Sequence, residues 1–214
     1  MTDNEVAAQI RQVADQLEAR VDLLRALADE LDSQAGGAPP FEDISETLPV
    51  NHQPDHPYLV ARGWVWWPER DLSEIAGITI HHTLSHSPLA TATYCTRPQA
   101  QGGKGYPSIQ YHFWVSQGDG CPVYLCAPLE WQIWHDHTGP YPKTISIGLA
   151  GRLHLAKPPH EQVEAAARLI RWLMDQYGIP LDEVRGHCER YAGTICPGWN
   201  QTGWRDDLFA LITP

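Results

Sequence analysis

Apolar residues recur at helical spacing through the first 36 residues of the chain. They lie seven positions apart at Ile10, Leu17, Leu24 and Leu31. Charged and amide side chains fill the positions between them, so the pattern predicts an amphipathic helix within residues 1–36 that Gly36-Gly37 closes. The stripe fits either a short coiled coil of about four heptads or a helix packed on its own domain, and both alternatives stay open.

Proline punctuates the polar stretch that follows this helix. The prolines of this stretch are Pro39, Pro40, Pro49, Pro54 and Pro57. Proline cannot donate a backbone hydrogen bond and stiffens an extended chain. Residues 37–57 are therefore predicted to be a linker that leads into a separate domain.

Short apolar runs alternate with turn residues after the linker, and one long amphipathic segment follows them. The runs that predict strands cover residues 77–81, 111–115 and 144–149. Between residues 161 and 177, apolar side chains share one helical face, and Gly178 supplies a stop signal. We therefore predict one α/β domain over residues 58–214, with the long helix packed on the sheet.

Acidic residues outnumber basic ones along the chain. The 26 Asp and Glu residues against 15 Lys and Arg give a formal net charge of -11. This excess disfavours a large basic surface, so we expect no nucleic-acid partner. The polar, acidic start does not resemble a signal peptide, and no apolar run approaches the roughly 18 residues of a membrane span.

The chain has five cysteines, an odd number that leaves at least one thiol unpaired. Cys121 and Cys126 cannot form a disulfide within a straight strand, because their spacing places them on opposite faces about 16 Å apart. The sequence does not decide the redox state of Cys95, Cys121, Cys126 and Cys188.

Nitrogen and sulfur ligands stand at the edges of the predicted elements. They are the pair His81-His82 at the end of a strand, His187 after a glycine, and Cys196 before a proline. Imidazole and thiolate are the ligands that Zn²⁺ prefers, and three protein ligands leave a fourth position for a reacting water. Adjacent strand residues face opposite ways, so only one of His81 and His82 can reach a shared site, and periodicity does not choose between them.

Five short strings, in this order, resemble the superfamily of N-acetylmuramoyl-L-alanine amidases and peptidoglycan recognition proteins. They are Ile78-Thr79-Ile80-His81-His82-Thr83, Tyr111-His112-Phe113, Ser146-Ile147-Gly148, Gly186-His187 and Thr194-Ile195-Cys196-Pro197-Gly198. The resemblance covers roughly residues 58–208 and leaves out the N-terminal helix. It implies a mixed central β-sheet flanked by helices, with a zinc ion on the floor of a substrate groove.

Carried over position by position, the resemblance implies that His81, His187 and Cys196 bind zinc. It implies that Tyr111 orients the water or the scissile carbonyl, and that Thr194 donates a hydrogen bond to the developing oxyanion. Tyr111 could instead be a buried aromatic residue, and Thr194 could merely cap a turn. The implied reaction is hydrolysis of the amide bond between N-acetylmuramic acid and L-alanine in peptidoglycan.

Cys196 favours a hydrolase, because superfamily members that only recognise peptidoglycan commonly lose this cysteine. The alternatives are a non-catalytic peptidoglycan-binding module and a zinc amidase for another N-acyl substrate. One departure concerns a glutamate that some members carry after the Ser-Ile-Gly strand, where this chain has Leu149-Ala150-Gly151. Another is Cys188, which is either an inert thiol or a rival ligand.

The pair Trp134-His135 occupies the position of a superfamily loop over the groove, so both residues are candidate substrate contacts. The expected partner is peptidoglycan or a muropeptide, with an oligomer or a partner protein bound through the N-terminal helix. The lack of a visible signal predicts a cytoplasmic protein until release, either a phage lysin or a recycling enzyme that acts on cell wall material.

Overall fold

The computed structural model describes residues 37–137, 142–199 and 203–213, and ten positions between Arg11 and Leu24. The chain divides into two compact units, Met1–Pro39 and Pro40–Pro214. In the first unit, the ten described positions are all helical, and Leu17, Val21 and Leu24 among them are exposed. The remaining positions of the predicted helix within residues 1–36 lie outside the described residues.

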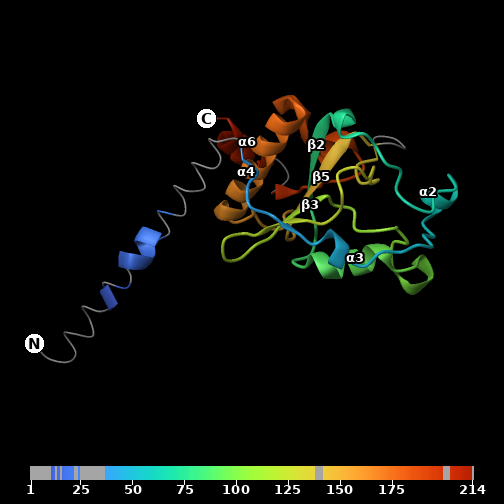
Figure 1. Cartoon of the computed structure of the whole chain (residues 1–214), viewed down its shortest axis with the longest axis horizontal. Coiled ribbons are helices and arrows are strands. Elements are labelled where there is room, and N and C mark those ends of the chain that lie inside the picture. The colour runs from blue at the N-terminus through green and yellow to red at the C-terminus, as the bar shows by residue number, and fades with distance from the viewer. Residues whose placement is uncertain are drawn as a thin grey trace, which may run out of the picture. The chain divides into compact units, whose positions relative to one another are not determined.

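A mixed β-sheet forms the centre of the second unit (Figure 1). Among the described residues, its strands are β1 (Glu42–Asp43), β2 (Gly77–His82), β3 (Phe113–Val115), β4 (Val123–Leu125), β5 (Thr144–Leu149) and β6 (Val184–Gly186). They lie in the order β1-β4-β3-β5-β2-β6. The β3–β4 pair is antiparallel and the other pairs are parallel. The mixed sheet with flanking helices confirms the predicted fold class.

One face of the sheet is apolar and is covered by α4 (His160–Tyr177) and α6 (Trp204–Ile212) (Figure 1). Alternate residues of the strands point to this face, among them Ile78 and Ile80 of β2. Helix α4 turns Ala166, Ile170 and Leu173 toward them and ends at Gly178, whose φ of 64° is left-handed. The predicted helix of residues 161–177 is confirmed to within one residue at its start.

On the opposite face of the sheet lie the polar side chains that alternate with these apolar ones along the strands. A second apolar cluster packs on part of this face and includes Trp114 of β3 and Ala92 of α3 (Pro88–Thr96). Helix α3 lies on the side of the sheet away from α4 (Figure 1). The remaining helices are α2 (Pro57–Val60) and α5 (His187–Arg190), with short 3-10 turns at Ser45–Thr47, Leu72–Glu74, Gln99–Gln101 and Leu181–Glu183.

Residues 40–57 belong to the compact unit, although the sequence pattern predicts a linker over 37–57. Glu42 and Asp43 pair with β4 as a short edge strand, and the Leu48 side chain is buried in the second apolar cluster. Proline is tolerated at a sheet edge and in extended segments, so this proline-rich composition also suits a chain that lies along a domain. The predicted boundary at residue 58 therefore falls too late.

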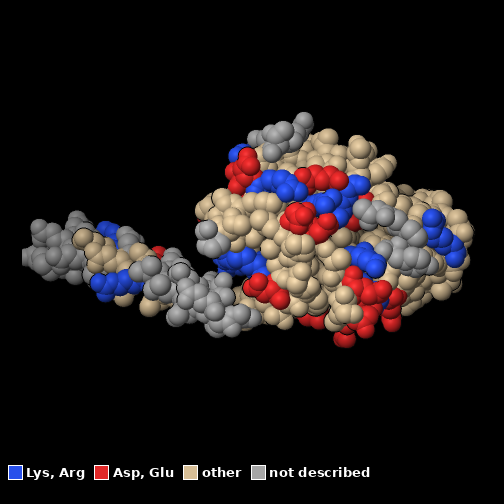
Figure 2. Space-filling view, turned by 90° about the horizontal axis from the view of Figure 1, so that it is seen from above, with Lys and Arg blue, Asp and Glu red and all other residues tan. Residues whose placement is uncertain are grey.

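Charged side chains of both signs lie next to one another on the surface that Figure 2 shows. Two of the ion pairs are Arg205 with Glu189 and Arg185 with Glu183, each at 2.7 Å between nitrogen and oxygen. None of the described helices is long and apolar enough to cross a membrane. All five cysteines are free thiols, and four of them are buried.

Candidate metal centre

His81 lies on the polar face of the sheet because of its place in β2. The strand alternates, so Ile78 and Ile80 enter the core beneath α4, while Thr79 and His81 point the other way. The side chain of His82, the next residue, consequently points away from the polar face. Its ring lies 5.2 Å from that of His154, measured between centroids. The structure thus resolves the choice between the two adjacent histidines that periodicity left open.

His187 reaches the same place through the neighbouring strand. In the parallel β2–β6 pair, Ile80 is aligned with Gly186, so the residue after Gly186 lies beside His81. His187 is the first residue of α5, and its ring centroid lies 4.7 Å from that of His81. Ladder register, rather than proximity in sequence, therefore brings the two imidazoles together.

Cys196 returns to the site on the loop after α5. Its carbonyl accepts a hydrogen bond from the Cys188 amide at 2.6 Å, which fixes the loop next to α5. Its Sγ accepts the His82 amide at 3.3 Å and lies 3.7 Å from His81 Nδ1. The sulfur is therefore held between a backbone donor and an imidazole nitrogen.

The three side chains offer one ligand atom each within 4.8 Å of one another, and no other such group of His, Cys, Asp or Glu occurs among the described residues. His81 and Cys196 are buried and His187 is half-buried. His187 Nε2 is buried without a hydrogen-bond partner in the described part of the chain, as expected of a nitrogen that can bind a cation. Two imidazoles and one thiol suit zinc, so the donor set fits this ion.

Burial keeps both imidazoles in the neutral form that binds metal. Desolvation, followed by the nearby His135, lowers the pKa of His187 to about 4 and that of His81 well below its ordinary value. Desolvation raises the pKa of the Cys196 thiol to about 12, although the His82 amide opposes this shift. A cation that binds here must therefore displace the thiol proton.

Tyr111 lies beside this group, with its ring centroid 5.5 Å from that of His81. Burial raises the pKa of Tyr111 well above its ordinary value, so the phenol keeps its proton and can act as a donor. Its ring fits because position 148 is glycine. A Cβ built on Gly148 would meet Tyr111 Cδ1 at 3.0 Å and Thr83 Cγ2 at 2.7 Å. The Gly148 requirement was not anticipated from the sequence.

Thr194 caps the turn that leads to Cys196. Its Oγ1 accepts the Cys196 amide at 3.1 Å, and the side chain remains partly exposed. Accepting this bond leaves the hydroxyl proton free to be donated elsewhere. Turn capping and donation to a substrate are therefore compatible at this position.

The two candidate substrate contacts, Trp134 and His135, occupy different environments. Trp134 is half-buried and stacks on Tyr58 at 3.9 Å between ring centroids. His135 is only 5% exposed, and its Nδ1 lies 3.0 Å from His81 Nε2. His135 thus has little surface to offer a substrate and instead touches a candidate metal ligand from behind.

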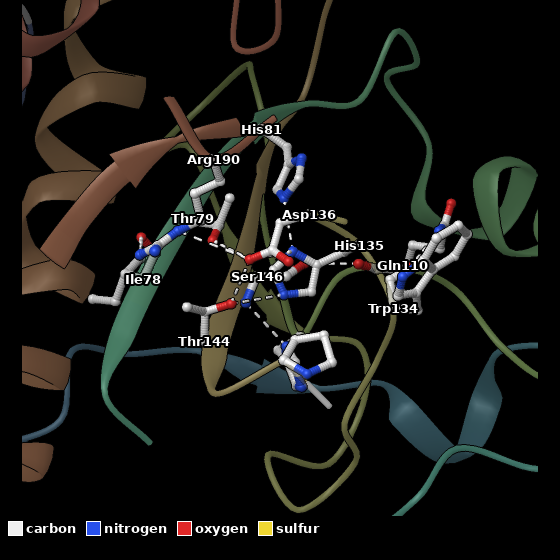
Figure 3. A network of polar contacts seen from close by, with 12 residues as sticks. Ile78, Thr79, His81, Gln110, Trp134, His135, Asp136, Thr144, Ser146 and Arg190 are labelled. Atoms are coloured by element: carbon white, nitrogen blue, oxygen red, sulfur yellow. Dashed lines mark hydrogen bonds and ion pairs between the residues drawn. The ribbon is translucent and has the colours of Figure 1, made fainter. Parts of the chain in front are cut away.

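A buried polar network extends from His135, and the sequence pattern does not predict it. It consists of Asp136, Thr144, Thr79 and Arg190 (Figure 3). The only sequence signal was an acidic residue next to Trp134-His135, and no periodic pattern distinguishes a buried aspartate in a loop from an exposed one. His137 was also missed: its ring stacks on Tyr191 at 4.4 Å and lies 5.7 Å from the His187 ring.

The family model described as N-acetylmuramoyl-L-alanine amidase matches residues 71–199, more than half of the 214-residue chain. The chain belongs to this family. All three candidate ligands and Tyr111 fall within the matched residues. Comparison with curated protein sequences finds no match.

Solved structures with the same fold include both amidases and peptidoglycan recognition proteins. The endolysin amidase LysCS from Clostridium intestinale URNW is 19% identical, with a TM-score of 0.54 over 81% of this chain and 98% of that one. Bumblebee PGRP-SA is 20% identical, with a TM-score of 0.56 over 75% and 90% of the two chains. Drosophila PGRP-LB is 20% identical, with a TM-score of 0.53 over 81% and 92%. At these identities the likeness shows the fold alone.

Proposed function

We propose that this chain is a zinc-dependent amidase that hydrolyses the bond between N-acetylmuramic acid and L-alanine in peptidoglycan. The convergence of His81, His187 and Cys196 within 4.8 Å, in a domain of the amidase family, supports this activity most directly. The three residues come from β2, from the start of α5 and from a later loop, so only the folded chain assembles them.

A zinc ion held by these three side chains would acidify a bound water and polarise the scissile carbonyl. The chain supplies the remaining groups. The Tyr111 phenol stays protonated and can orient the carbonyl oxygen or the attacking water from beside His81. Thr194 keeps a donor proton next to Cys196 and can stabilise negative charge as it develops on that oxygen.

Aromatic rings border the metal centre and suit a glycopeptide substrate. Trp134 lies between Tyr58 and His137, with ring centroids 3.9 Å and 4.4 Å away. The apolar faces of sugar rings pack well on such side chains, whereas the net charge of -11 gives no general attraction to an anionic wall. The likeness to an endolysin and to peptidoglycan recognition proteins supports peptidoglycan as the substrate class and a role in cell wall degradation.

Paired cysteine variants test the proposal. Cys196→Ser should lose tight zinc binding and amide cleavage, because serine is a poor zinc ligand at neutral pH. Cys188→Ser is the matched control, since Cys188 is a half-buried thiol in contact with the same loop but outside the ligand group. Zinc content is measured by elemental analysis, and mass spectrometry identifies the fragments released from purified peptidoglycan.

Stem peptides released with a free L-alanine amine would support the proposed bond specificity. Full zinc binding and activity in Cys196→Ser would refute the ligand assignment. A wild-type protein that binds zinc and wall material without releasing peptides would be a recognition module. Cleavage of small N-acyl amides in preference to muramyl peptides would point to a different substrate.

A further inference from the structure

A chain of buried polar contacts leads away from the candidate metal centre, starting at the far side of the His81 ring (Figure 3). His81 Nε2 lies 3.0 Å from His135 Nδ1, and His135 Nε2 lies 3.1 Å from Thr144 Oγ1. Thr144 Oγ1 in turn lies 2.9 Å from Asp136 Oδ2. The three residues behind His81 are at most 6% exposed, so water has little access to these contacts.

The direction of each hydrogen bond follows from the Asp136 end. An ionised carboxylate only accepts hydrogen bonds. Asp136 Oδ2 accepts from Thr79 Oγ1 at 3.1 Å and from Thr144 Oγ1 at 2.9 Å. The guanidinium of Arg190 lies 3.8 Å from the same oxygen and balances its charge.

A hydroxyl has one proton, so Thr144, having donated it to Asp136, can only accept from His135. His135 Nε2 therefore carries a proton. A neutral imidazole has a single N–H, so the proton on Nε2 leaves His135 Nδ1 as a bare acceptor that faces His81 Nε2 at 3.0 Å. The alternative contact from His135 Nδ1 to Asp136 Oδ2 is 4.0 Å long, too long for a hydrogen bond.

Because His135 Nδ1 accepts, the short contact requires His81 Nε2 to be the donor. The proton of the neutral His81 ring is then on Nε2, and the lone pair is on Nδ1. His81 Nδ1 is the atom that lies 3.7 Å from Cys196 Sγ, on the side of the metal centre. The opposite tautomer would place an N–H in the metal site and leave two bare nitrogens facing each other.

We propose that Asp136, Thr144 and His135 are positioning residues that fix the tautomer and orientation of His81, so that Nδ1 is presented to the metal. This inference rests on the proposed function only in taking the ion to be zinc. Hydrogen bonds behind a metal-bound histidine set its tautomer and raise its basicity, and their loss typically weakens metal binding about 10- to 100-fold.

Substitution of Thr144 by valine interrupts this series of hydrogen bonds with little change in the shape of the side chain. Thr144→Val removes the hydroxyl and should weaken zinc binding by about 10- to 100-fold. Thr144→Ser keeps the hydroxyl and should retain an affinity close to that of the wild type. Thr96→Val is the matched control, because Thr96 is also buried but bonds only within α3. Affinity is measured by competition with a chromophoric chelator, independently of activity.

A second measurement uses the metal-free wild-type protein and needs no variant. Long-range ¹H–¹⁵N spectra distinguish the two tautomers of a neutral histidine, and we expect His81 to carry its proton on Nε2. A proton on His81 Nδ1 would overturn the inference. So would wild-type zinc affinity in Thr144→Val.

The two proposals fail in different ways. A wild-type protein without zinc affinity would refute the proposed function, while the tautomer of His81 would still be measured directly. Tight zinc binding that is equal in Thr144→Val and Thr144→Ser would refute the positioning role and leave the metal centre intact. If Thr144→Val does not fold, the spectra of the wild-type protein decide.

Discussion

Arg70 offers a sharp test of how the segment that carries Trp134, His135 and Asp136 is held. Its side chain is 6% exposed and donates to three backbone carbonyls on both sides of that segment. The acceptors are Leu129 at 2.8 Å, Pro142 at 3.0 Å and Thr144 at 3.1 Å. Burial lowers the pKa of Arg70 to about 10, so the guanidinium remains charged at neutral pH.

Arg70→Met keeps the apolar stem and removes all three donors. Each orphaned buried carbonyl costs about 1–3 kcal/mol, and burying methionine in place of a cation offsets part of the sum. Three orphaned carbonyls would together cost about 3–9 kcal/mol, and we expect the free energy of unfolding to fall by about 3 kcal/mol, the low end of that total. With a urea m-value of about 2 kcal/mol/M, the denaturation midpoint should fall by about 1.5 M.

Urea denaturation followed by tryptophan fluorescence measures this loss on the metal-free protein. Arg152→Met is the control, because Arg152 is exposed and should tolerate the change with less than about 0.5 kcal/mol of effect. A loss below about 1 kcal/mol in Arg70→Met would contradict the reasoning, since it would mean that the three carbonyls do not depend on the guanidinium.

Three further predictions concern pH and the metal centre. Burial, followed by the charge of Arg70, holds the pKa of His112 well below the 6.5 of an unfolded chain. Below about pH 6.5 the unfolded state therefore binds a proton at His112 that the folded state does not bind. The free energy of unfolding is at its full value above about pH 6.5 and falls below it, by up to about 1.4 kcal/mol per pH unit for this histidine. Urea midpoints at several pH values check this, and His112→Gln should flatten the slope. Tyr111→Phe should keep zinc affinity while kcat falls about 100- to 1,000-fold, and an unchanged kcat would exclude a role for the phenol. Gly148→Ala should displace the Tyr111 ring, lower kcat and cost about 1–3 kcal/mol of stability in the same urea assay, whereas normal turnover would show that the ring can move without consequence.

Local patterns in the sequence were sufficient for β2, which carries His81, and for α4, which covers the apolar face of the sheet. The β-branched run before His81 predicts β2, and the stripe from Val163 to Leu173 predicts α4, because each pattern matches the period of one backbone geometry. The ordered strings around His81, His187 and Cys196 identify the family, and the family model covers the same region. The N-terminal stripe predicts a helix, and its oligomeric or partner-binding role stays a prediction.

Residues 40–57 show where local patterns fail. Proline content predicts a linker there, yet Glu42–Asp43 pair with β4 and the Leu48 side chain is buried. Composition reports the stiffness and polarity of a segment. It does not report whether a sheet edge elsewhere in the chain is available to pair with that segment.

The sequence by itself determined which residues could bind a metal, and the tertiary structure decided how they meet. Side chains alternate along β2, and the packing of Ile78 and Ile80 in the core leaves His81, rather than His82, on the face of the metal centre. The alignment of Ile80 with Gly186 places His187 beside His81. The contacts of His135 and Asp136 with β5 and with His81 depend on segments far apart in the chain. The direction of a hydrogen bond depends on which groups are in contact. It therefore cannot be predicted from the residue types along the sequence.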